Sequence, residues 1–208
     1  MTKQYNKSQK GDTLDKRNHD LYETPWQATR ALINNINLGS LIYEPCYGRG
    51  AIVDELNRSL HKIRLKIITS DIICHDNNNP PNVVKDFLQI KPSDFPKCQL
   101  GVYSIVTNPP FKNLLPQKFI LHGLSLAPRV YMLLRLAFLE GSSKERCEAL
   151  SHCRRVLVFK NRIPRMHRDG WAGSKASSTV AYGWFEFDRN IHSSIEIERI
   201  EWDKSWVK

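Results

Sequence analysis

The sequence of 208 residues has no long apolar run, and none approaches the 18 residues that a membrane-spanning helix needs. Residues 1–20 are polar and lack the apolar core of a signal peptide. These absences predict that nothing spans a membrane, and they favour a cytoplasmic location. A chain of this length can bury one hydrophobic core. We therefore expect a flexible arm over residues 1–20, followed by a single domain over residues 21–208.

Cysteine is scarce, since there are five, an odd number, and no Cys-x-x-Cys pair. Neither a disulfide framework nor a zinc site is expected, and a reducing compartment fits this pattern. The sequence also lacks the Gly-x-x-x-x-Gly-Lys-Ser/Thr loop that cradles a triphosphate. Acidic residues are outnumbered, with 21 Asp and Glu against 31 Lys and Arg, which gives a net charge of +10. This balance favours a nucleic-acid partner over a merely basic surface.

Apolar runs and turn residues alternate along the chain as they do in α/β proteins. The predicted strands cover residues 41–44, 65–70, 83–84, 102–107, 129–135, 155–160, 180–187 and 195–202. The predicted helices cover residues 26–36, 51–60, 115–126 and 138–150, with Thr24 as the first N-cap and Pro25 as the first helical residue. This order predicts a Rossmann-like, mostly parallel sheet with helices on both faces. The last two strands, with no helix between them, predict an antiparallel edge.

The segment Asn108-Pro109-Pro110-Phe111 directly follows a predicted strand. An adenine amino group is a poor nucleophile, because its lone pair is delocalised into the ring. The Asn108 side-chain oxygen and the Pro109 carbonyl can each accept one N–H bond from such a group, and the prolines hold both acceptors in place. Phe111 offers a face on which a base can stack. A plain Pro-Pro turn after a strand is the structural alternative.

Other candidate residues also follow predicted strands. The segment Glu44-Pro45-Cys46-Tyr47-Gly48-Arg49-Gly50 ends the first strand, and its glycines let the backbone pass close to a ligand. Asp71 follows the second strand, where an acid can accept ribose hydroxyl groups. Asp86 and Phe87 follow the short third strand. Because ligands bind beyond the carboxyl ends of the strands in open α/β sheets, we expect these residues to share one site.

In this order, the motifs resemble those of the S-adenosylmethionine-dependent DNA N6-adenine methyltransferases, particularly the small phage and bacterial members with the gamma order. The resemblance covers residues 20–112 and, more loosely, 160–188. It implies a class I methyltransferase sheet, S-adenosylmethionine as cofactor and a catalytic loop made of residues 108–111. The cofactor-binding residues that it implies are Tyr22, Thr24, Pro25, Glu44, Pro45, Cys46, Gly48, Gly50, Asp71, Ile72, Asp86, Phe87 and Asn108.

Some residues leave alternatives open. Arg49 departs from the family pattern, since it places a cation near a positively charged sulfonium, and we expect its side chain to point outward. Asp86 can instead be a helix cap, although the cofactor role is favoured, and Tyr22 can equally be a packing residue. Few residues follow Phe111, and they must complete the sheet. Recognition of base sequence is therefore expected to be short or weak.

The stretch 161–178 is rich in glycine, serine and basic residues, has no periodicity and is too long for a simple connector. We expect it to be a substrate loop that meets phosphates and stacks on a base. The predicted substrate-binding residues are Phe111, Lys112, Arg162, Arg165, Arg168, Trp171, Lys175 and, on the next strand, Trp184. The alternatives are a solvated loop with incidental charge and, for Trp184, a core tryptophan.

The sequence thus predicts an enzyme that moves a methyl group from S-adenosylmethionine to the N6 amino group of adenine in DNA. The base would be flipped out of the stack, and its amino nitrogen would attack the methyl carbon without help from a metal or a strong base. Three alternatives remain open. They are an RNA adenine-N6 methyltransferase, a protein glutamine methyltransferase and a non-catalytic protein of the same fold that binds nucleic acid.

Overall fold

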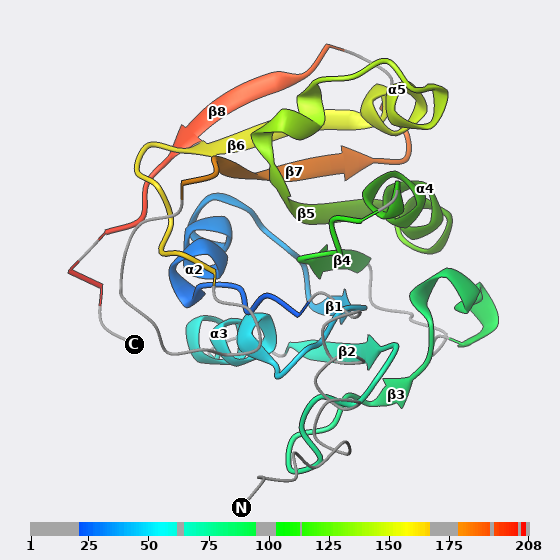
Figure 1. Ribbon diagram of the computed structural model, residues 1–208. Helices are drawn as coiled ribbons and strands as arrows, with labels where there is room; N and C mark the ends of the chain where they lie inside the picture. Colours follow the sequence, from blue (N-terminus) through cyan, green and yellow to red (C-terminus); the bar gives the residue numbers. More distant parts are fainter. Residues whose placement is uncertain are drawn as a thin grey trace, which may run out of the picture.

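The computed structural model describes residues 21–61, 65–94, 103–112, 114–166, 179–191, 194–203 and 205–206, so the predicted arm over residues 1–20 lies outside it. The described residues form an eight-stranded sheet in the order β3-β2-β1-β4-β5-β7-β6-β8 (Figure 1). The strands are β1 (Leu41–Glu44), β2 (Lys66–Asp71), β3 (Val83–Val84), β4 (Tyr103–Thr107), β5 (Arg129–Arg135), β6 (Cys153–Phe159), β7 (Tyr182–Asp188) and β8 (Glu196–Ile200). The helices are α2 (Trp26–Asn35), α3 (Ala51–Ser59), α4 (Leu115–Leu126) and α5 (Lys144–Ser151), with 3₁₀ turns η1 (Phe87–Gln89), η2 (Pro92–Asp94) and η3 (Leu136–Leu139).

The sheet is mostly parallel, which confirms the predicted fold class. The antiparallel part is the single strand β7, which pairs with both β5 and β6. Strand β8 lies outside β6 and pairs with it in parallel. Burial explains this arrangement, because β7 is buried on both faces from Gly183 onward whereas β8 carries exposed residues at Glu196 and Ile197. A strand that is apolar on both faces belongs inside a sheet, and a half-exposed strand belongs at its edge.

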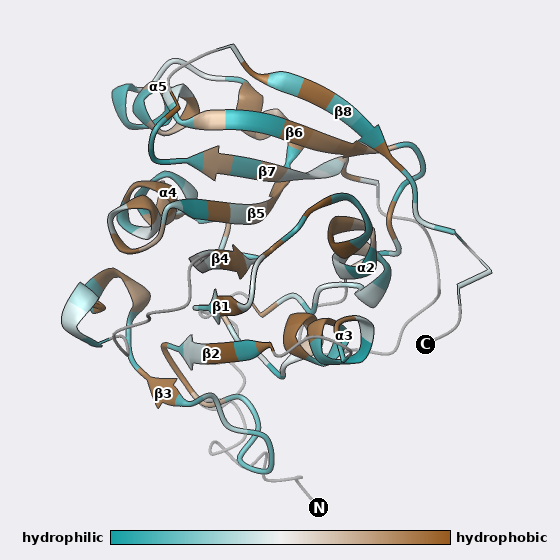
Figure 2. Ribbon diagram, turned by 180° about the vertical axis from the view of Figure 1, so that it is seen from behind, coloured by the Kyte–Doolittle hydropathy of each residue, from teal (hydrophilic) through white to brown (hydrophobic). Residues whose placement is uncertain are grey.

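Two apolar cores lie on opposite faces of the sheet (Figures 1 and 2). Helices α2 and α3 cover one face, and α4 and α5 cover the other. Trp184 belongs to the first core and Phe185 to the second, since successive strand residues point to opposite faces. Figure 2 shows apolar residues along the strands and a largely polar α5. Within the described ranges, no helix is long and apolar enough to cross a membrane.

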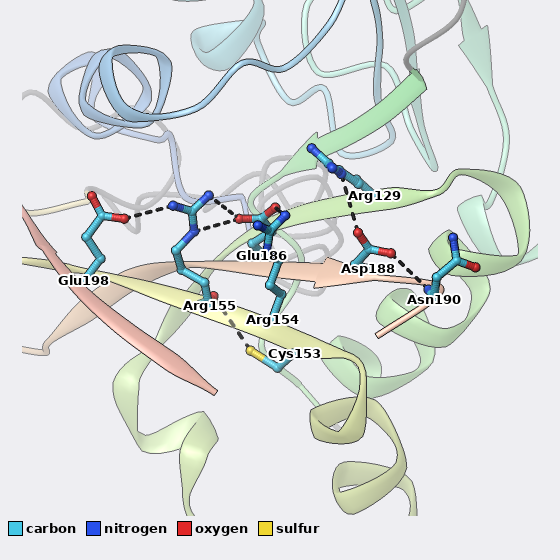
Figure 3. Close-up of polar contacts among 8 residues, drawn as sticks. All are labelled: Arg129, Cys153, Arg154, Arg155, Glu186, Asp188, Asn190 and Glu198. Atoms are coloured by element: carbon cyan, nitrogen blue, oxygen red, sulfur yellow. Dashed lines mark hydrogen bonds and ion pairs between the residues drawn. The ribbon is translucent and has the colours of Figure 1, made fainter. Parts of the chain in front are cut away.

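Charged side chains join the last four strands in the order β5, β7, β6 and β8 (Figure 3). Glu186 on β7 is 1% exposed, and its Oε2 accepts a hydrogen bond from Nε of Arg155 on β6 at 2.8 Å and forms an ion pair with Nη2 of the same arginine at 2.7 Å. Arg155 also reaches Glu198 on β8 at 2.9 Å. Arg129 on β5 pairs with Asp188 on β7 at 3.5 Å. These ion pairs cross every strand junction in this part of the sheet, so they fix the register there.

The chain changes its direction of travel across the sheet between β1 and β4. From β1 it proceeds through α3 to β2 and β3, and it then returns to β4, which pairs in parallel with β1 on the other side. Helix α4 next leads to β5, farther from β1. The loops after β1 and β4 therefore leave from one edge and diverge toward opposite faces, which opens a space between them.

Two helix predictions differ from the structure. Helix α2 begins at Trp26 with Pro25 in the N-cap position, so Thr24, predicted to be the cap, lies one residue too early and is buried instead. The predicted helix over residues 138–150 is divided into η3 and α5. Gly141, with a φ of +98°, stops the first turn, and Ser143 caps the next helix by accepting a hydrogen bond from the Arg146 amide.

Candidate active site

A cavity opens at the carboxyl ends of β1, β2 and β4, where the chain changes direction. Predicted site residues that line it are Tyr22, Thr24, Pro45, Cys46, Gly48, Asp71, Ile72, Asp86, Phe87, Asn108 and Pro110. The predicted residues Pro25, Glu44, Gly50 and Pro109 stand next to these in the chain but do not line the cavity. Lining residues that the sequence did not single out as site residues are Leu21, Glu23, Tyr47, Arg49, Ala51, Ile52, His75, Leu88, Leu115 and Phe119.

The turn after β1 has the left-handed backbone that its glycines predict. Gly48 and Gly50 have φ values of +57° and +90°. A Cβ atom on Gly50 would lie 2.7 Å from the Tyr47 hydroxyl oxygen, so the turn has no room for one. The amide of Tyr47 donates to the carbonyl of Ser70 on β2 at 3.0 Å. The glycine turn is therefore held against the end of β2, with its backbone at the cavity wall.

Asp71 ties this turn to the second strand. Its Oδ2 accepts a hydrogen bond from the Gly48 amide at 2.8 Å, and its Oδ1 accepts one from the Ile73 amide at 3.4 Å. Nε2 of His75 lies 3.9 Å from Oδ1, and both side chains are largely buried. A carboxylate has lone pairs for further donors, so Asp71 can hold the turn and still accept ribose hydroxyl groups. His75, four residues along a turn-rich loop, had no signal in the sequence.

Glu44 joins the glycine turn to the loop that follows β4, residues 108–111, without lining the cavity itself. Its side chain is 1% exposed, and Oε1 accepts hydrogen bonds from the Cys46 amide at 2.9 Å and from Oγ1 of Thr107 at 2.6 Å. The other oxygen, Oε2, is buried and has no hydrogen-bond partner among the described residues. Burial raises the pKa of this carboxyl well above its usual range. Glu44 therefore sets the position of Thr107, the residue directly before Asn108.

Asp86 and Phe87 form the far wall of the cavity. The Asp86 side chain accepts a hydrogen bond from the Leu88 amide at 3.0 Å, so it caps η1, as the alternative interpretation expected. Phe87 is 2% exposed and packs against Phe119 with a centroid distance of 4.8 Å. Both residues still line the cavity. The wall is thus apolar with one carboxylate at its margin.

Asn108 has its carboxamide held in one orientation. Its Nδ2 donates to the backbone carbonyl of Tyr22 at 3.0 Å and lies 3.6 Å from Sδ of Met166. A carbonyl can only accept, so this contact fixes the nitrogen on that side. The Oδ1 atom is then a buried acceptor without a partner in the described part of the chain. Such atoms are rare and costly, so this one points to an N–H donor that arrives with a ligand.

The described basic residues lie outside the cavity or at its rim. Arg49 is exposed and pairs with Glu23 at 3.3 Å, but both residues line the cavity, so the expected outward direction of Arg49 stays a prediction. Arg162 and Arg165 are exposed and alternate with the buried Ile163 and Met166, which hold the start of the predicted substrate loop against the core. Lys112 is also exposed. The predictions for Arg168, Trp171 and Lys175 fall outside the described residues.

Two aromatic residues do not lie where the sequence predicted. Trp184 is 0% exposed, and its indole nitrogen donates to the carbonyl of Ala28 at 2.8 Å. It is a core residue beneath α2, so the prediction that it contacts substrate is wrong. Phe111 is half-buried outside the cavity, with the Arg135 guanidinium 5.1 Å above its ring. A role in stacking on the target base stays a prediction.

No protein-family model matches the sequence, and no curated protein matches it. Solved structures do resemble it. A modification subunit of a putative type I restriction enzyme from Vibrio vulnificus has a TM-score of 0.57 and 13% identity, covering 99% of this chain and 55% of that one. A putative class I S-adenosylmethionine-dependent methyltransferase from Listeria monocytogenes has a TM-score of 0.54 and 10% identity, covering 91% and 71%. A putative RNA methyltransferase from Pyrococcus horikoshii has a TM-score of 0.50 and 13% identity, covering 91% and 100%.

These likenesses establish the fold, which is that of the class I S-adenosylmethionine-dependent methyltransferases. The chain spans about half the length of the Vibrio subunit.

Proposed function

We propose that this chain transfers a methyl group from S-adenosylmethionine to the N6 amino group of adenine in DNA. The observation that carries the proposal is the state of Asn108. Its nitrogen is held by Tyr22, and its buried Oδ1 has no hydrogen-bond partner among the described residues, beside a cavity at the switch point of the sheet. An adenine amino group has two N–H donors, and in this proposal Oδ1 of Asn108 and the carbonyl of Pro109 would accept them.

The residues around the cavity suit S-adenosylmethionine. Three carboxylates, from Glu23, Asp71 and Asp86, line it, together with one arginine, Arg49, and the imidazole of His75. An excess of carboxylates favours a ligand that carries a sulfonium and an ammonium group. The glycine turn lets the backbone approach the ligand, and Asp71 stands where ribose hydroxyl groups need an acceptor. When bound, this cofactor supplies an electrophilic methyl group.

The chain's own residues then have positioning roles. The two acceptors of the catalytic loop hold the N6 hydrogens, which moves the nitrogen toward tetrahedral geometry and directs its lone pair at the methyl carbon. Glu44 keeps this loop in register with the glycine turn, through Thr107 and Cys46. The nitrogen loses its extra proton after transfer. The acceleration thus comes from placement of the two reactants rather than from a strong base.

The choice of DNA rests on charge and on the motif resemblance. The net charge of +10 and the exposed arginines at residues 162 and 165 favour a polyanion. One similar structure is a modification subunit of a restriction enzyme and another is a putative RNA methyltransferase. RNA is therefore the second candidate substrate, and one assay separates the two polymers.

The test is transfer of a tritiated methyl group to duplex DNA, single-stranded DNA and RNA, followed by digestion to nucleosides. We expect the label in N6-methyldeoxyadenosine. Asn108→Ala should lower kcat by about 100-fold or more, as removal of one aligned hydrogen-bonding group does in other active sites. The Kd for the cofactor, measured by calorimetry, should stay within about twofold, because Asn108 acts on the substrate in this proposal.

The control is Asn34→Ala, which removes an exposed carboxamide at the end of α2 and should leave transfer unchanged. Full activity in Asn108→Ala would refute the role of the catalytic loop. Label on a base other than adenine, or on protein, would refute the proposed substrate.

A further inference from the structure

A second groove lies on the other side of the catalytic loop. Pro110 faces the cavity described above, whereas its neighbour Phe111 lines this groove together with residues of α4, η3 and α5. Its charged lining residues, in the described part of the chain, are two arginines, Arg135 and Arg146. The remaining lining residues are apolar apart from Gln117. The groove is thus cationic and aromatic, and it begins one residue from the methyl-transfer site.

Each arginine lies over an aromatic ring. The Arg135 guanidinium is 5.1 Å from the centre of the Phe111 ring, and the Arg146 guanidinium is 5.2 Å from the centre of the Phe138 ring. Stacking of this kind holds the planar guanidinium in one orientation while its N–H groups remain directed sideways. Arginines held in this way suit phosphate oxygens and the flat faces of bases.

Two polar contacts help to position Arg146. Its Nη1 donates to the backbone carbonyl of Glu140. With the buried Gln117 carboxamide oriented to satisfy both of its atoms, its oxygen accepts from Nε of Arg146 at 3.3 Å.

The rim of the groove contains a strained residue. Leu114 has a φ of +58°, and it is the single non-glycine residue with positive φ in the described ranges. This conformation costs about 1–2 kcal/mol for a residue with a Cβ. The Leu114 side chain is nevertheless 44% exposed, so the strain is not repaid by burial in the core. Strain of this kind concentrates where a ligand is bound.

We propose that this groove binds the nucleotide that flanks the methylated adenine. Its base would pack against the apolar wall made by Phe111 and Leu114, and its phosphate would meet Arg135 and Arg146. The inference rests on the proposed function, since a flanking nucleotide exists only if the substrate is a polynucleotide. It adds a source of sequence preference, namely the neighbour of the target base.

The experiment uses 12-nucleotide single-stranded DNA with one adenine, in which the neighbouring base on the 5′ or the 3′ side is replaced by an abasic site. Binding to the fluorescein-labelled strands is measured by anisotropy with the Asn108→Ala protein, and KM by methyl transfer with the active one. For one of the two sides, we expect the abasic site to raise Kd and KM by about tenfold. The double variant Arg135→Gln/Arg146→Gln should bind intact strands about tenfold more weakly and should no longer distinguish intact from abasic strands.

A second variant, Leu114→Gly, suits the left-handed backbone and so keeps the fold, yet it should also lose part of the discrimination. The control is Arg199→Gln, an exposed arginine of β8, which should retain the full abasic effect. Cofactor Kd should be unchanged in all of these variants. Equal abasic effects in the double variant and the unaltered protein would overturn the inference.

An acidic peptide is the other occupant that the charge allows. Tight binding of polyglutamate that is lost in the double variant, with oligonucleotide binding unchanged, would also overturn the inference. Failure of the proposed function would give a different result. Methyl transfer would be absent with every polynucleotide, whereas the binding measurements would still report on the groove.

Discussion

At the scale of single residues, Glu44 makes stability depend on pH. Burial raises its pKa in the folded chain, so the folded state favours the protonated acid. Its contribution to stability is complete below the pKa of the unfolded chain, about 4.3, and is lost as the pH rises toward the higher folded value. Glutamine keeps an oxygen acceptor for Cys46 and Thr107 and does not titrate.

Glu44→Gln should therefore be more stable than the unaltered protein at pH 8, and the difference should shrink at pH 5. Thermal unfolding of both proteins at the two pH values, without cofactor, measures this. A difference that is the same at pH 5 and pH 8 would show that Glu44 does not titrate between them.

Some residues of the candidate site could be placed from the sequence and others could not, depending on how far along the chain their neighbours lie. Gly48, Asp71 and Asn108 could be placed together from the sequence, because each directly follows a strand and parallel strands end at one edge. The carbonyl of Tyr22 and the sulfur of Met166 could not be placed, since they reach Asn108 from 86 and 58 residues away. In addition, no sequence pattern indicates which backbone carbonyl or which methionine sulfur will contact a site residue.

At the scale of elements, the glycine turn has the strictest geometry. Gly50→Ala forces a Cβ into a left-handed residue and against the Tyr47 hydroxyl, so we expect a loss of about 1–2 kcal/mol in stability. Gly39→Ala, with a φ of +80° between α2 and β1, is the matched control. Denaturant unfolding should show similar losses for the two variants, whereas calorimetry should show weaker cofactor binding for Gly50→Ala alone. Weakened binding in both would indicate a general effect of destabilisation.

Helices and strands could be predicted where the sequence pattern that specifies them is local. The strands that end at Glu44 and Thr107 follow from short apolar runs, and α4 begins near a proline that suits its first turn. The place of β7 between β5 and β6 was not predictable, because strand order depends on pairing between segments that are distant in the sequence. The substrate role of Trp184 was predicted from the family resemblance, whereas the buried position of this residue follows from the place of β7 inside the sheet.

At the scale of the whole molecule, the positive charge should govern affinity for nucleic acid. If Arg162 and Arg165 each contact a phosphate, the double variant Arg162→Gln/Arg165→Gln should reduce the slope of log K against log salt concentration by about 1.8 for duplex DNA. Anisotropy titrations at several salt concentrations measure the slope. The control is Lys66→Gln/Arg199→Gln, which removes two exposed charges on β2 and β8. Equal slopes for the two double variants would exclude a specific role for the segment after β6.

The position of β7 has a consequence for biosynthesis. A ribosome completes β5 and β6 before residues 182–188, which must fit between them, have been made. Until then, β5 presents an unpaired, apolar edge on which strands of other nascent chains can assemble. A stalled chain that ends before residue 182 should therefore remain protease-sensitive and require chaperones, whereas release of the whole polypeptide should close the gap.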